Sequence, residues 1–335
     1  MKNKLIVSLA PHLHNPNNTT AKMMFNVVIA LMPALIVSSM IYGWRVLFVS
    51  LFSVACCLLF EWFIKKYMLG GKPTLCDGSA VVTGLLLAFN LPLNIPLWMV
   101  AVGALVAIGV AKMTFGGLGK NPFNPALVGR VFLLVAFPVA MTTFPEVTGA
   151  VAGGTTDALS GATPLAMMKM AAKGDVPMTE VLSRLEMQSL FMGIKSGSMG
   201  EISAIALLLG FAWLLYKRVI KWHIPVVVLG TMFVIGGVAH LLAPESFIQP
   251  LYHILTGGAI LGAVYMATDY VTSPMTVKGS VIYAIGIGAI TMAIRMKGAY
   301  PEGMSFAILI MNSFVPLIDK YILPKRFGAV KEAKK

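Results

Sequence analysis

Long apolar segments, separated by short polar or charged ones, follow one another along most of this chain. Because a bilayer-spanning helix needs about 20 mostly apolar residues, the pattern predicts about ten such helices. They lie at residues 24–42, 46–64, 79–91, 97–113, 126–141, 202–216, 224–242, 251–268, 281–293 and 306–322. The third and the ninth are short for a bilayer, and short or broken helices normally face protein or an internal cavity. The sequence therefore predicts an all-α integral membrane protein.

A weak internal repeat refines this architecture. Residues 83–92 resemble residues 261–270, and each copy begins at the corresponding point of a five-helix block. An odd number of helices in each repeat inverts the second copy across the membrane, as in many transport folds. We therefore expect two inverted five-helix repeats, at residues 23–141 and 202–322. A polar loop at 142–201 joins them, and short segments at 1–22 and 323–335 flank them.

Composition and charge agree with a membrane protein and give it an orientation. Hydrophobic residues make up 58% of the chain and charged residues only 12%, with a mean hydropathy of +0.83. The net charge of +13 does not indicate nucleic-acid binding, because the basic residues gather at the ends of apolar segments. With a cytoplasmic N-terminus, 19 of the 26 Lys and Arg residues fall on the cytoplasmic side and 7 on the outer side. Both termini are predicted inside, and the loop at 142–201 outside.

That outer loop contains the most distinctive motif of the chain, Asp-Ala-Leu-Ser-Gly-Ala-Thr at 157–163. Ser160, Gly161 and Ala162 place almost no bulk before the hydroxyl of Thr163, so a modifying enzyme that reads Asp157 could attach a large phosphorylated group there. Thr163 is also a natural helix N-cap, because a proline and a helical segment follow it. The two interpretations are compatible, since a helix N-terminus favours a phosphate.

Other candidate residues have a functional and a structural interpretation. The carboxylates of Glu61, Asp77 and Asp269 lie at or near span ends, where they could belong to an ion pathway or be interfacial and solvated. Backbone N–H groups of Gly197, Ser198 and Gly200 could cradle a phosphate, or the segment could be a flexible loop that ends in an N-cap.

Two further groups of residues complete the candidates. Asn121 and Asn124, each followed by Pro, could line a cavity or form an ordinary turn. The three cysteines have no metal-ligand spacing, so no metal site is expected.

Taken together, six motifs resemble one known family. They are Ser-Leu-Ala-Pro-His at 8–12, Cys-Asp-Gly-Ser-Ala at 76–80, Gly-Lys-Asn-Pro-Phe-Asn-Pro-Ala at 119–126, the motif at 157–163, Gly-Ser-Met-Gly-Glu at 197–201 and Ala-Thr-Asp at 267–269. The chain resembles RnfD, a membrane subunit of Rnf-type ferredoxin:NAD oxidoreductases, which is homologous to NqrB of the sodium-pumping NADH:quinone reductases. Its short N-terminal segment looks more like the former.

The resemblance implies that Thr163 carries FMN through a phosphoester. A flavin transferase that recognises Asp157, Ser160, Gly161, Ala162 and Thr163 would attach it outside the cytoplasm. The resemblance also implies a noncovalent flavin, expected to be riboflavin, although no motif locates it. The expected partners are Rnf subunits A, B, C, E and G in the inner membrane, where the complex would couple electron transfer to Na⁺ or H⁺ translocation.

The chain by itself should not oxidise NADH or ferredoxin. It has no dinucleotide-binding fingerprint between a strand and a helix and no cysteine spacing for an iron–sulfur cluster. Two alternatives stay open on the sequence alone. One is an NqrB-like component of a quinone reductase, and the other is a stand-alone channel or secondary transporter, because an inverted repeat with interrupted helices is equally typical of transporters.

Overall fold

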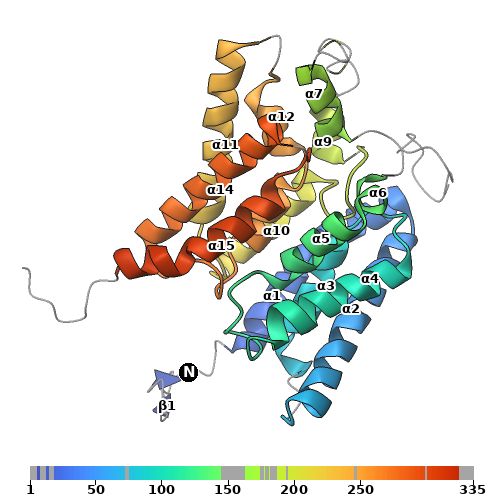
Figure 1. Ribbon diagram of the computed structural model, residues 1–335, viewed down its shortest axis with the longest axis vertical. Coiled ribbons are helices and arrows are strands. Elements are labelled where there is room, and N and C mark those ends of the chain that lie inside the picture. Colours follow the sequence, from blue (N-terminus) through green and yellow to red (C-terminus); the bar gives the residue numbers. More distant parts are fainter. Residues whose placement is uncertain are drawn as a thin grey trace, which may run out of the picture.

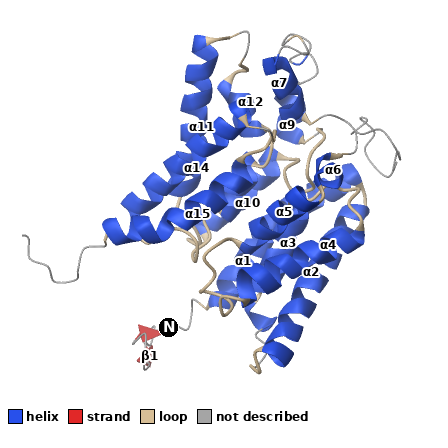
Figure 2. Cartoon of the chain, in the orientation of Figure 1, coloured by secondary structure: helices blue, strands red, loops and turns tan. Residues whose placement is uncertain are grey.

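The computed structural model describes residues 6–7, 13–14, 19–71, 75–144, 163–173, 177, 181, 187–193, 195–244, 247–298 and 300–323. These residues are helical except for loops and one small hairpin, in which strands β1 (Ile6–Val7) and β2 (Leu13–His14) pair antiparallel. Figure 2 shows how completely helices dominate the described chain. The all-α prediction is confirmed for this part of the protein.

The first half of the molecule is a bundle that begins with two long helices. Its elements are α1 (Thr20–Tyr42), α2 (Arg45–Phe63) with the π-helical turn η1 (Ile64–Met68), η2 (Leu75–Asp77), α3 (Ser79–Phe89), α4 (Leu97–Leu105) with η3 (Val106–Met113), α5 (Pro125–Ala136) and α6 (Pro138–Thr142). The predicted fifth span ran to residue 141. It ends earlier because Pro138 has no N–H with which to continue the α5 ladder.

The second half of the molecule is a second group of helices. Its elements are α10 (Ala204–Tyr216), α11 (His223–Leu242), α12 (Pro250–Leu255), α13 (Ala259–Leu261) with η4 (Gly262–Met266), α14 (Val277–Lys297) and α15 (Met304–Tyr321). Between the halves lie α7 (Pro164–Lys173) and α9 (Met187–Met192). In Figure 1, α7, α9 and α12 gather at the same end of the molecule.

Two predicted spans of this half differ from the structure. The eighth was predicted as one helix at 251–268, but it is interrupted at residues 256–258, where Gly257 has a φ of +66°. The ninth was predicted to be short, at 281–293, but α14 has 21 residues. Its extra turns contain Lys278 and Arg295, and the pattern of apolar residues stops short of both charges. Arg295 is nevertheless buried in the protein.

Among the described residues, four helices are long and apolar enough to cross a membrane, namely Thr20–Tyr42, Arg45–Met68, His223–Leu242 and Val277–Lys297. Large apolar side chains such as Leu51, Leu209 and Leu241 are exposed on the outer faces of the helices, which suits contact with lipid. The count of ten spans stays a prediction.

The two halves use matching packing partners. In the first half α2 contacts α3 and α4, and α4 contacts α5; in the second half α11 contacts α12 and α14, and α14 contacts α15. The first helices of the halves, α1 and α10, pack on each other. The internal repeat and its inversion across the membrane both stay predictions.

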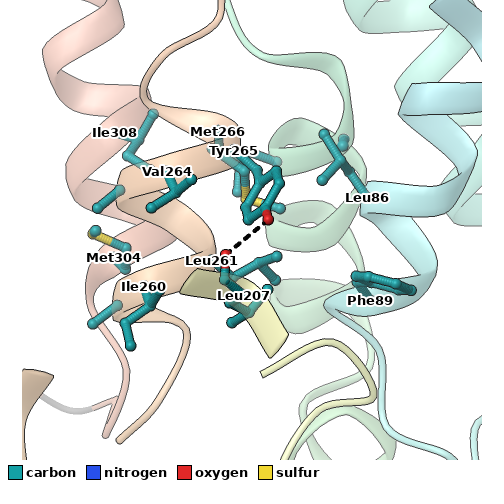
Figure 3. Close-up of a cluster of buried hydrophobic side chains, with 14 of the residues drawn as sticks. Leu86, Phe89, Leu207, Ile260, Leu261, Val264, Tyr265, Met266, Met304 and Ile308 are labelled. Carbon is teal, nitrogen blue, oxygen red and sulfur yellow. Dashed lines mark hydrogen bonds between the residues drawn. The ribbon is translucent and has the colours of Figure 1, made fainter. Parts of the chain in front are cut away.

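A buried cluster joins the halves at the centre of the molecule (Figure 3). It brings together side chains of α3, α10, η4 and α15, and the hydroxyl of Tyr265 donates to the carbonyl of Leu207 at 2.9 Å. At Gly210 a Cβ atom would lie 2.0 Å from the carbonyl oxygen of Ala30, so only glycine allows α10 to approach α1 so closely. Small residues serve this purpose at helix contacts in membranes, where apolar burial gives little driving force.

Candidate functional site

Of the predicted attachment residues, the structure describes Thr163. Asp157, Ser160, Gly161 and Ala162 lie outside the described residues. Its hydroxyl oxygen accepts the backbone N–H of Ala166 at 3.2 Å, and its carbonyl accepts that of Met167. The predicted N-cap of α7 is therefore confirmed. Thr163 is half-buried, and its hydroxyl lies at the N-terminus of a ten-residue helix, the positive end of the helix dipole.

A small cavity opens beside Thr163. It has a volume of about 20 Å³, enough for one water molecule. Its walls come from four segments that are far apart in the sequence: the start of α7, the loop at 195–203, the interruption between α12 and α13, and residues 301–302. We call it the Thr163 cavity. Lys195, Glu201 and Glu302 are the charged residues in its wall.

These three residues belong to a larger set of charges, which we call the charged cluster: Arg130, Lys195, Glu201, Arg295 and Glu302. Arg130 on α5 forms an ion pair with Glu302 and also donates to the hydroxyl of Ser305. All members except Glu302 are less than a tenth exposed. Such charges are costly in a low-dielectric interior unless partners compensate them.

The interruption between α12 and α13 explains why the charges gather here. The last carbonyls of α12 have no partner within the helix, and Lys195 donates to that of Leu255 at 2.6 Å. Arg295 donates to the carbonyls of His253 and Thr256. On the other side of the interruption, the N–H of Gly258 donates to Glu302 at 2.7 Å. Cations thus lie at a helix C-terminus and a carboxylate at an N-terminus, as the helix dipoles favour.

Burial and neighbouring charges shift the pKa values of the loop residues in the cluster. Burial raises the pKa of the Glu201 carboxyl, and the adjacent Glu302 carboxylate adds to the rise. Burial lowers the pKa of Lys195 to about 8, against the opposing effect of Glu201. Burial alone would raise the pKa of Glu302, but Arg130 outweighs it and holds that pKa below its usual range.

The N–H groups predicted to cradle a phosphate have other partners. Those of Gly197 and Ser198 donate to Tyr42 and Glu201, and that of Gly200 donates to the carbonyl of Phe89. A Cβ atom on Gly200 would lie 2.3 Å from the Cβ of Phe89. These glycines therefore allow the loop to pack against the end of α3. The contacts favour the structural interpretation of the segment over the phosphate cradle.

A second and larger cavity lies elsewhere in the fold, with a volume of about 90 Å³. We call it the large cavity. Its wall is mostly apolar, and its polar side chains include those of Ser79, Thr83, Lys112, Asn121, Asn124 and Asp269. An apolar cavity with a few converging polar groups is typical of a cofactor site. The structure therefore places Asn121 and Asn124 at a cavity. Asn124 also caps α5 and donates to the carbonyl of Met266 at 3.2 Å.

The three predicted ion-pathway carboxylates all have partners. Glu61 forms a buried ion pair with Lys112 at 2.6 Å. Asp77 caps α3 by accepting from the N–H and the hydroxyl of Ser79. Asp269 accepts from the hydroxyl of Thr272 at 3.1 Å. Of these three, Asp269 lies directly in the wall of the large cavity, and Glu61 reaches it through Lys112.

Helix α5 connects the two regions. Its N-cap, Asn124, lines the large cavity, and Arg130 is six residues further along, a rise of about 9 Å in an α-helix. Reasoning from the sequence treated Lys112, Arg130, Lys195 and Arg295 only as topology signals. For two of them the sequence does contain a signal of a buried partner. Lys112 and Arg130 lie inside apolar segments, where a charged side chain requires a partner.

Comparisons with known proteins identify the family of this chain. The family model described as "NQR2, RnfD, RnfE family" matches residues 6–328. The chain belongs to this family. It is 42% identical over 332 residues to the D component of the proton-translocating ferredoxin:NAD(+) oxidoreductase complex of Clostridium ljungdahlii, covering 98% of this chain and 97% of the relative.

Two other relatives are similar over comparable lengths. The D component of the Na(+)-translocating ferredoxin:NAD(+) oxidoreductase complex of Acetobacterium woodii is 43% identical, with 98% of this chain and 96% of the relative covered. The D component of the ion-translocating oxidoreductase complex of Stutzerimonas stutzeri is 37% identical, with 92% of each covered. Relatives named for protons and for sodium are almost equally similar, so overall similarity does not select the coupling ion.

Proposed function

We propose that the chain is the FMN-carrying membrane subunit of an ion-translocating ferredoxin:NAD oxidoreductase of the Rnf type. Its FMN would be joined to Thr163 through a phosphoester by a flavin transferase. The observation that carries the proposal is the position of Thr163, whose hydroxyl caps α7 beside a cavity with a buried lysine in its wall. The family membership supports it, since relatives over nearly the whole chain are named as the D component of such complexes.

The residues around Thr163 fit a phosphate group in two ways. The N-terminus of α7 directs N–H groups and a partial positive charge toward it. Lys195 lines the same cavity and has one acceptor, the carbonyl of Leu255, among the described residues, so further N–H donors of its ammonium group can face the phosphate. When bound, the flavin supplies the electron-transfer chemistry, and the protein orients it and adjusts its electrostatic surroundings.

A noncovalent flavin, expected to be riboflavin, would have to widen the large cavity, because its volume of about 90 Å³ is below the roughly 300–1,000 Å³ of ligand pockets. The mostly apolar wall, with Asn121, Asn124 and Lys112 among the lining residues, is the feature that supports placing the flavin ring there. We further propose that the chain acts with the other Rnf subunits in the cytoplasmic membrane. Both termini would be inside and Thr163 outside, and electron transfer would be coupled to Na⁺ or H⁺ movement.

Intact-mass measurement tests the attachment. Full-length protein produced together with the flavin transferase should carry one FMN, and peptide mapping should find it on Thr163. Thr163→Ala should remove the covalent flavin and leave the noncovalent flavin, which denaturation releases. Thr163→Ser, which keeps a hydroxyl, is the matched control for the helix cap. Covalent flavin on the Thr163→Ala chain would refute the assignment, and unmodified native protein would favour a channel or transporter.

An NqrB-like role in a quinone reductase is the second candidate, because the family model includes both kinds of protein. The two candidates share the flavin and differ in the electron acceptor. Purification of the native complex separates them: co-purification of the chain with a ferredoxin-type iron–sulfur protein supports the Rnf assignment, whereas reduction of quinone by the complex supports the alternative.

A further inference from the structure

Glu201 has a buried carboxylate whose charge is poorly compensated. Its side chain is 8% exposed, and one oxygen, Oε1, accepts the N–H of Ser198 at 3.1 Å. The other oxygen, Oε2, has no hydrogen-bond partner among the described residues. Burying a polar oxygen without a partner is unfavourable, and burying a charged one is more so. A proton on Oε2 would remove the charge.

The neighbouring carboxylate of Glu302, unlike that of Glu201, has an ion-pair partner. Glu302 faces Glu201 across Gly258: a Cβ atom on Gly258 would lie 2.6 Å from Oε1 of Glu302 and 3.5 Å from Oε2 of Glu201. Glu302 is held in its ionised form by Arg130 and by the N–H of Gly258. When two carboxylates approach each other and only one has a cation, the other is the one that binds a proton.

The remaining groups around Glu201 bond other partners, although Lys195 and Arg130 are near enough to oppose the rise of its pKa. Lys195, on the same loop, donates to the end of α12, and so does Arg295 from α14. Arg130 on α5 is paired with Glu302, and the hydroxyl of Tyr42 on α1 bonds carbonyls of the loop. Lys169 on α7 donates to the carbonyls of residues 298 and 300. None of these forms an ion pair with Glu201 among the described residues.

Glu201 and Thr163 line the same cavity, and the volume of that cavity allows a water molecule between them and solvent. Charges that share a buried site of low dielectric interact far more strongly than charges in water. Negative charge added near Thr163 therefore makes it easier for Glu201 to bind a proton. The structure thus brings a carboxylate with no ion pair among the described residues to the same cavity as the residue that would carry the flavin.

We propose that Glu201 is a proton-binding site linked to the redox state of the flavin on Thr163. Oε2 takes up a proton from water, forming an O–H bond, when a low-potential one-electron donor adds negative charge to the flavin. The proton returns to water when that charge leaves. The direction of the Glu201 pKa agrees with this role, since burial and Glu302 already favour the protonated form. The inference rests on the proposed attachment of FMN to Thr163.

Potentiometric titration of the purified full-length chain carrying FMN tests the proposal at a series of pH values. The Thr163→Ala chain supplies the signal of any noncovalent flavin, which is subtracted. Over part of the pH range, the wild type should take up as much as one proton more for each electron than Glu201→Gln. That difference is a tenfold change in the reduction equilibrium for each pH unit, about 59 mV for one electron. Asp319→Asn removes a carboxylate at the far end of α15 and should match the wild type.

Each outcome of the titration either supports or refutes the linked proton site. Superimposable curves for the wild type and Glu201→Gln, both carrying FMN, refute the linked proton site and leave the proposed function intact. Absence of FMN from Thr163 in the intact mass refutes the proposed function and the inference with it. Should Glu201→Gln fail to fold, redox-induced infrared difference spectra of the wild type replace it. A carbonyl band of a protonated carboxyl must appear on reduction and shift in D₂O, and its absence overturns the proposal.

Discussion

The buried pair Glu61–Lys112 should show a large and non-additive contribution to stability. Each residue is 1% exposed, their charged atoms are 2.6 Å apart, and Lys112 also donates to the hydroxyl of Ser79 at 2.7 Å. Lys112→Met keeps a side chain of similar length but leaves the Glu61 charge buried without its cation. Removing one partner of a buried ion pair costs about 3–5 kcal/mol. The double change Glu61→Gln with Lys112→Met removes both charges and should restore most of the loss.

Denaturant titration in mixed micelles, followed by tryptophan fluorescence, measures the four proteins of this cycle. Lys65→Met provides a matched control, because Lys65 lies 3.8 Å from the same carboxylate and is more exposed; its loss should cost at most about 1 kcal/mol. Lys112→Met as stable as the Lys65→Met control would contradict the reasoning. So would a double variant as unstable as the two single losses added together, since the pair would then have no coupling energy.

Two further predictions concern helix packing and pH. Gly210→Ala should separate α1 from α10 and lower the thermal unfolding midpoint markedly, whereas Gly230→Ala, with no atom within 4 Å of the new Cβ, should leave it nearly unchanged; equal midpoints would show that the contact tolerates a methyl group. For Lys195, burial lowers the pKa from 10.5 to about 8, so between these values the unfolded chain binds a proton that the folded chain does not. Stability should therefore rise with pH across that window. Lys195→Met should remove this part of the rise, and an unaltered pH profile would contradict the assignment.

The helical segments of this protein were largely predictable because their causes are local. Apolar runs of the right length and caps such as Thr163 before Pro164 mark helices without any knowledge of their neighbours. The starts of α3 and α4 agree with the predicted residues 79 and 97. The predicted helix bounds were wrong where a contact with a distant segment overrides the local pattern. Helix α14 continues past a charge that the protein buries. The eighth predicted span is interrupted where Lys195 and Arg295 donate to its carbonyls.

The candidate site likewise has one part that the sequence predicts and one part that only the fold brings together. The motif around Thr163 and the cap that this residue provides are properties of adjacent residues, so the sequence contains them directly. The charged cluster is not, because its members Arg130 and Glu302 are separated by 172 positions. The same holds for the separate pair of Lys112 and Glu61, which are 51 positions apart. Patterns along a chain reveal that a buried charge needs a partner and do not name it.

The sequence by itself therefore determined a membrane-embedded helical protein with one distinctive hydroxyl, since hydropathy and capping act over a few neighbouring residues. Only the tertiary structure decided that this hydroxyl lies beside two carboxylates and a buried lysine from distant segments. The physical reason is that a low-dielectric interior forces charges into pairs, and the folding of the whole chain chooses which charges meet.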